Sequence, residues 1–171
     1  MSSAKIVIQV ILSILFVLVF VGLLLFIPAG TIEWLEGWIY ILLLLIFVVS
    51  YYTYFMIKNP STLEQREKLS SSFEDKITLI IIGILFVSLL VLPALDFQFQ
   101  WFQLPTIIKV IGNLGVALSY IIIFLVMKEN PFASKGLTIH EDQTVITTGP
   151  YAVVRHPIYT SLSIIISRYA Y

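Results

Sequence analysis

Hydrophobic residues fill four long stretches of the chain, and polar residues gather between them. The stretches are Ile6–Ile27, Trp38–Ile57, Ile77–Leu95 and Ile107–Met127. A helix needs about 20 residues to cross a bilayer core of roughly 30 Å, and each stretch has that length. Because lipid offers the backbone no hydrogen-bond partners, we expect each stretch to be a helix. The pattern predicts an all-α polytopic membrane protein of one domain with four transmembrane helices.

Prolines are placed where such helices would begin, bend or end. Pro28, Pro60 and Pro131 follow three of the stretches, and Pro105 precedes the last one. Pro93 lies near the end of the third stretch, where we expect it to bend the helix. These positions support the four predicted boundaries, since proline is tolerated in a first helical turn and disrupts a helix interior.

Composition agrees with a membrane protein and excludes several function classes. The chain is 59% hydrophobic and 12% charged, which excludes a soluble domain and a disordered chain. Its formal net charge of zero predicts no attraction to nucleic acid, so the lipid bilayer is the expected surrounding partner. The absence of cysteine excludes disulfides, thiolate metal sites and a cysteine nucleophile.

Basic residues are distributed unevenly between the two sides of the predicted four-helix arrangement. Lys109 lies on one side, near Asp96, Glu33 and Glu36. The other nine lie on the opposite side: Lys5, Lys58, Arg66, Lys68, Lys76, Lys128, Lys135, Arg155 and Arg168. Positive charge favours the cytoplasm, so we expect the N-terminus and residues 128–157 on the cytoplasmic side of the cell membrane.

Aromatic and metal-binding residue types give two further expectations. Trp34, Trp38 and Trp101 cluster near the outer boundary, as an interfacial aromatic belt would. A metal site would need convergent ligands, yet the chain has only two histidines, His140 and His156. A solvated loop is the favoured interpretation of His140 and its acidic neighbours, and we predict no metal site.

Residues 149–159, GPYAVVRHPIY, form the densest cluster of unusual residue types in the chain. An Arg–His pair at a membrane is costly unless it is paired or binds something. A proline-kinked loop at the lipid headgroups is the alternative interpretation of this cluster. No G-x-G-x-x-G or Walker-type loop accompanies it, which excludes the common nucleotide-binding folds. Gly112 and Gly115 are expected to be close-packing positions between helices.

Residues 130–159, NPFASKGLTIHEDQTVITTGPYAVVRHPIY, resemble the isoprenylcysteine carboxyl methyltransferase family, particularly its bacterial members. Those proteins carry a strand-like V-x-T-G-P-Y piece followed by V-R-H-P-x-Y, and phospholipid N-methyltransferases share part of this core. The segments IPAGTIEW and NPSTLEQR, which follow the first and second stretches, also fit the bacterial pattern. The resemblance thus covers nearly the whole chain.

The resemblance implies an enzyme that uses S-adenosyl-L-methionine, bound by a cytoplasmic cofactor loop within residues 128–159. Carried over by motif, the cofactor-binding residues would be His140, Gln143, Thr144, Val145, Ile146, Tyr151, His156, Pro157, Ile158 and Tyr159. His140 stands where relatives often have glutamine. The catalytic residues stay unassigned.

The C-terminus departs from the family pattern. Relatives continue after the R-H-P-x-Y motif through a helical hairpin and a segment with Arg and Glu, whereas this chain stops at Tyr171. We therefore expect a C-terminally truncated member, with a short helix at residues 158–168 that is too short to span. Such a helix leaves apolar surface exposed, which favours association with another chain.

The leading functional interpretation is a membrane methyltransferase acting on a lipophilic or lipidated carboxylate, thiol or amine, with turnover by this shortened chain left open. A non-catalytic pseudoenzyme or partner protein is one alternative. An NADPH-dependent membrane reductase, a class that also carries an R-H-P-x-Y-like motif, is the other.

Overall fold

Four long helices form the protein in its computed structural model, which describes residues 3–58, 73–129 and 147–167. The first long helix consists of three consecutive pieces, α1 (Ser3–Phe16), the π-helical turn η1 (Val17–Val21) and α2 (Gly22–Ala29). The other three are α3 (Leu35–Lys58), α5 (Phe73–Phe99) and α6 (Thr106–Glu129). Two shorter helices follow, α7 (Pro150–Val153) and α8 (Pro157–Ser167). The described residues contain no strand.

All four long helices are long and apolar enough to cross a membrane, which confirms the predicted all-α polytopic fold. The spans are Val7–Ala29, Leu35–Lys58, Leu79–Phe99 and Thr106–Glu129. Large apolar side chains point outward along them, such as Ile27, Ile80 and Leu114, each more than 60% exposed. Such a surface suits lipid, because lipid tails are as apolar as the side chains themselves.

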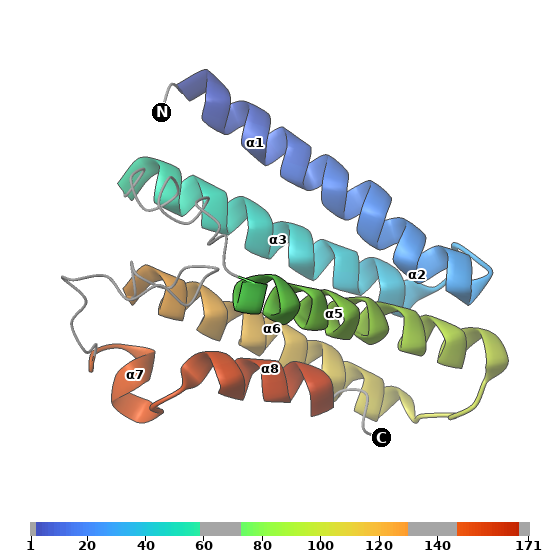
Figure 1. The fold of residues 1–171 in the computed structure, drawn as a ribbon. Helices are drawn as coiled ribbons and strands as arrows, with labels where there is room; N and C mark the ends of the chain where they lie inside the picture. Colours follow the sequence, from blue (N-terminus) through green and yellow to red (C-terminus); the bar gives the residue numbers. More distant parts are fainter. Residues whose placement is uncertain (1–2, 59–72, 130–146, 168–171) are drawn as a thin grey trace.

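The long helices lie side by side and alternate in direction (Figure 1). In the first long helix, α1 packs against α3 and α2 packs against α5. Helix α3 also packs against α6. The buried core lies mostly where these helices meet, and it includes Val21, Leu25, Leu90, Ala94 and Val116. Helix α8 packs against α6 at the edge of the bundle opposite α1 (Figure 1).

Prolines mark some helix boundaries as predicted and not others. Pro105 directly precedes α6, as expected, and Pro93 lies inside α5, which continues to Phe99. Pro28, expected to follow the first helix, lies inside α2 instead. The helix ends at Gly30, whose positive φ of 69° allows its N–H to bond the Ile27 carbonyl at 3.1 Å. Pro60 and Pro131 lie outside the described residues.

The π-helical turn η1 was not predicted. Its signature is the hydrogen bond from the Gly22 N–H to the carbonyl oxygen of Val17, five residues back. Val17 and Val21, at the two ends of the turn, are buried, and the three residues between them are exposed. Because this turn contains one residue more than an α-helical turn, α2 is rotated about the helix axis relative to α1. This rotation sets the face that α2 presents to α5.

The predicted tryptophan belt is only partly correct. Trp38 and Trp101 are about half exposed, as interfacial anchors would be, but Trp34 is 6% exposed and belongs to the core. Its ring stacks on Phe97 with centroids 5.4 Å apart. Gly37 makes this possible, since a Cβ there would lie 2.8 Å from the Trp34 ring.

Helix α8 confirms the predicted short helix beyond the four spans. Its 11 residues extend about 16 Å, roughly half of a bilayer core. Gly115 of α6 faces it closely, because a Cβ there would lie 3.3 Å from Ile164 Cγ2. This contact confirms the close-packing role predicted for Gly115. Ser119 on α6 and Ser161 on α8 are fully buried, and both hydroxyls bond carbonyl oxygens of their own helices.

Candidate functional site

Residues 147–159, hereafter the motif segment, lie at the end of the bundle where α6 finishes (Figure 1). The segment contains the polar turn before α7, the whole of α7 and the beginning of α8. The same end of the bundle carries Lys58 and Lys128, in the last turns of α3 and α6.

Glu129, the last residue of α6, anchors the start of the motif segment. The Thr148 hydroxyl donates a hydrogen bond to its carboxylate oxygen Oε2 at 3.1 Å. The next residue, Gly149, adopts φ 58° and ψ −133°, a conformation that residues with a side chain rarely adopt. A Cβ on Gly149 would also lie 2.7 Å from Glu129 Cγ. Both the backbone angle and the carboxylate beside it therefore require glycine here.

Helix α7 is a single turn that begins with Pro150, whose fixed φ suits a first helical position. Backbone N–H groups of Tyr151, Ala152 and Val154 donate hydrogen bonds of 3.1–3.2 Å to carbonyls of the three residues 148–150. These local hydrogen bonds close a single helical turn, and extended backbone appears at Val154.

Pro157 opens α8 and fixes its position against the bundle. The Thr160 N–H bonds the His156 carbonyl at 3.2 Å, so His156 immediately precedes the first turn. Pro157 is buried, and its carbonyl oxygen accepts a hydrogen bond from the Ser161 hydroxyl, with the two oxygens 2.7 Å apart. The chain bends at Arg155, just before it enters the α6–α8 contact.

The structure brings two of the predicted cofactor-binding side chains together. His156 and Tyr159 are exposed, and their ring centroids are 5.8 Å apart. Within the described chain, the polar side-chain atoms of this pair make no hydrogen bond. Tyr159 is two residues beyond Pro157, which places it about 200° around α8 and away from α6.

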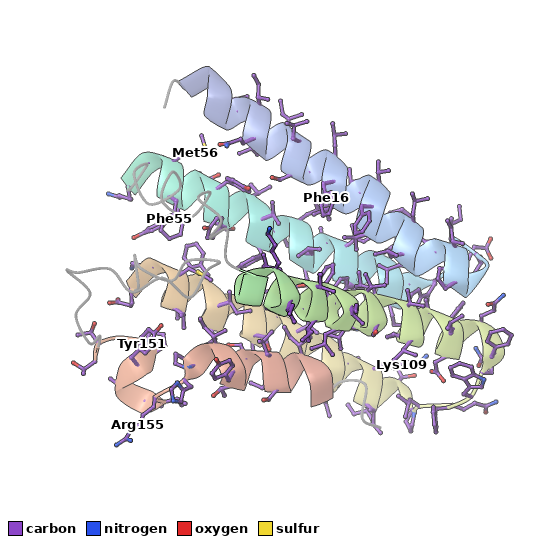
Figure 2. The ribbon with its side chains drawn as sticks, viewed as in Figure 1. Phe16, Phe55, Met56, Lys109, Tyr151 and Arg155 are labelled. Carbon is purple, nitrogen blue, oxygen red and sulfur yellow. The ribbon has the colours of Figure 1, made fainter. Side chains whose placement is uncertain are left out.

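Of the other predicted site residues, three are at least partly buried, and five lie outside the described residues. Tyr151 and Ile158 are half-buried, and Pro157 is buried, so these three contribute to packing as well as to the segment's shape. Arg155 is exposed and extends away from the bundle, whereas Tyr151 lies on the other side of α7 (Figure 2). His140, Gln143, Thr144, Val145 and Ile146 lie outside the described residues.

Glu129 and a cavity at the other end of the bundle were not predicted from the sequence. The cavity, hereafter the turn cavity, has a volume of about 660 Å³ and lies by the α5–α6 connection and the start of α3. Its lining contains three charged residues, Glu36, Asp96 and Lys109, and several aromatic ones. Lys109 Nζ and Glu36 Oε1 form an ion pair at 3.1 Å. Figure 2 shows Lys109 at the end of the bundle opposite Tyr151 and Arg155.

An apolar groove of about 480 Å³ lies beside η1, lined by residues of the first long helix, α3 and α5. Its polar lining consists of Ser13 and the phenol of Tyr52, which leaves few groups to orient a ligand. In the described ranges, no three His, Asp or Glu residues could hold a metal ion.

Comparisons of this chain with known protein families, with curated proteins and with solved structures find no match.

Proposed function

We propose that this integral membrane protein is an S-adenosyl-L-methionine-dependent methyltransferase whose cofactor is held by the motif segment. The observation that carries the proposal is the construction of that segment. Glu129 and the turn at Gly149 hold the start of the segment, and Pro157 holds its end. The His156–Tyr159 pair within it is exposed. A loop that served only as a connection would not need these constraints.

The side chains of the pair fit the chemistry of the cofactor. Its methionine carboxylate needs a hydrogen-bond donor, and the His156 imidazole has ring nitrogens for that role. Its adenine and ribose need an aromatic or apolar wall, which the Tyr159 ring offers. When bound, the cofactor supplies an electrophilic methyl group on a sulfonium sulfur. The chain's own contribution is to hold the reactants close together and shielded from water.

The acceptor in this proposal is a lipophilic carboxylate, thiol or amine that approaches from the bilayer. The outward faces of the four spans are apolar, so an amphiphilic molecule in the membrane reaches the end of α6 without crossing water. We propose in addition that this end of the bundle is cytoplasmic, because Lys58, Lys128 and Arg155 lie at this end and Lys109 lies at the other.

Ligand binding by the purified full chain tests the proposal. We expect S-adenosylhomocysteine to bind in detergent, as measured by calorimetry, and NADPH to give no signal. His156→Ala removes a hydrogen-bond partner of a charged group, which typically costs about 1–3 kcal/mol, or roughly 5- to 150-fold in affinity. Thr53→Ala, an exposed position on α3, is the matched control and should bind like the wild type.

Other results would select a different function. Binding of NADPH without S-adenosylhomocysteine would favour a membrane reductase. Binding of neither ligand would favour a non-catalytic partner protein. Equal affinity of the wild type and His156→Ala for S-adenosylhomocysteine would remove the role given to this histidine.

A further inference from the structure

The turn cavity lies at the end of the bundle away from the motif segment. The two regions are separated along α6, because Lys109 lies near its start and Glu129 is its last residue. Twenty residues of helix correspond to about 30 Å. Whatever binds in the turn cavity is therefore distinct from a ligand of the motif segment.

The charge of the cavity lining is negative. Glu36 and Lys109 neutralise each other in their ion pair, with exposed side-chain fractions of 21% and 42%. Asp96 remains as the third charged residue of the lining. Its Oδ1 accepts the backbone N–H of Phe102 at 2.9 Å, which shapes the turn after α5. Its Oδ2 has neither a hydrogen bond nor an ion pair with any described residue.

Four aromatic residues line the same cavity as this uncompensated carboxylate. Trp34, Phe97, Trp101 and Phe102 all line the cavity. Trp34 is 6% exposed and packs against Phe97 and Gly37, so the exposed rings of the lining include those of Trp101 and Phe102. The faces of aromatic rings attract cations, and quaternary ammonium groups are recognised by such rings. A carboxylate and several aromatic rings together favour a cation that is itself partly apolar.

We propose that the turn cavity binds an organic ammonium group, either as a free cation or as the headgroup of a lipid. Free choline and a phosphatidylcholine headgroup share the required chemistry, because both carry a trimethylammonium group. Trp101 and Phe102 are each more than half exposed, so their rings are accessible to a ligand from outside the bundle. The Gln100 and Gln103 amides in the lining add hydrogen-bonding capacity for the rest of such a headgroup.

Two binding measurements on the 171-residue protein distinguish the two sources. Choline chloride is titrated into the protein in detergent while tryptophan fluorescence is followed. The lipid is tested by native mass spectrometry after exchange into mixed phosphatidylcholine and phosphatidylglycerol nanodiscs. We expect saturable choline binding, selective retention of phosphatidylcholine, or both. Choline binding without lipid retention identifies a free cation as the source, and the reverse identifies a headgroup.

Asp96→Asn removes the charge and keeps an oxygen that can accept the Phe102 N–H. We expect it to weaken binding of the ammonium probe about tenfold, equivalent to about 1.4 kcal/mol. Glu33→Gln is the matched control, because Glu33 is an exposed carboxylate at the same end that does not line the cavity. It should bind like the wild type.

Three results would overturn the proposal. The first is that neither choline nor phosphatidylcholine binds the wild type. The second is preferential retention of phosphatidylglycerol, which would point to an anion site at Lys109. The third is equal binding by the wild type and Asp96→Asn. If Asp96→Asn does not fold, the choline and lipid measurements on the wild type still decide the question.

Discussion

At the scale of single residues, Gly149 links backbone geometry to the candidate site. Replacing Gly149 by alanine places a Cβ against Glu129 and forces an unfavourable backbone angle. Strain of this kind costs about 1–3 kcal/mol. We expect the free energy of opening of residues 147–153 to fall by that amount, measured by hydrogen–deuterium exchange with mass spectrometry.

Gly83→Ala is the control for this substitution. Gly83 lies in α5 with no other group within 4 Å of a built Cβ, and alanine favours helix over glycine. This variant should exchange as slowly as the wild type or more slowly. Equal acceleration of residues 147–153 in both variants would show that the contact between Gly149 and Glu129 does not hold the segment.

The positions of Glu129 and Trp34 could not be predicted from the sequence. The motif segment was visible because its residue types are unusual in so apolar a chain. Glu129 was not, since a carboxylate at the end of a helix is common and only the fold brings it to Thr148. The prediction for Trp34 was wrong for a related reason. Tryptophan as a residue type prefers the membrane interface, but the space left by Gly37 lets this ring pack into the core.

At the scale of elements, the hydrophobic pattern predicted the four spans because their length and apolar character are imposed by the bilayer. It could not predict η1, since a π-helical turn carries no residue signature in a run of Val, Leu and Phe. The turn cavity was missed because it depends on how Asp96, at the end of one helix, is placed against Glu36 and Lys109 of two others. Individual helices are local features, whereas cavities depend on how helices pack.

The contact between α6 and α8 is an element-scale feature that can be tested. Ser119 is fully buried, and it lies one turn after Gly115, which faces Ile164. Small residues at this spacing let two helices approach closely in a membrane. Ser119→Leu should overfill the contact at a cost of about 1–3 kcal/mol. We expect faster hydrogen exchange in residues 157–165, which would report displacement of α8.

Ser50→Leu makes the same chemical change at an exposed position of α3 and serves as the control. It should leave exchange of α8 unchanged. Unaltered protection of residues 157–165 in Ser119→Leu would mean that α8 is held by something other than this close contact. If the displacement also weakens binding of S-adenosylhomocysteine, α8 supports the candidate site in addition to carrying Tyr159.

At the scale of the whole molecule, the bundle separates two kinds of chemistry. One end carries the motif segment among basic residues, and the other carries a cavity with a carboxylate and aromatic rings. Helix α6 extends between the two ends and contributes Glu129 to one and Lys109 to the other. The separation has a functional meaning only if the two ends face different compartments.

Single-cysteine labelling tests this orientation directly, because the chain has no cysteine of its own. Arg155→Cys and Glu33→Cys introduce thiols at exposed positions of the two ends. If basic residues face the cytoplasm, a membrane-impermeant maleimide should label Glu33→Cys in intact cells. It should label Arg155→Cys only after the membrane is permeabilised. The reverse pattern would place the motif segment outside and contradict the proposed use of S-adenosyl-L-methionine there, since that cofactor is made inside cells.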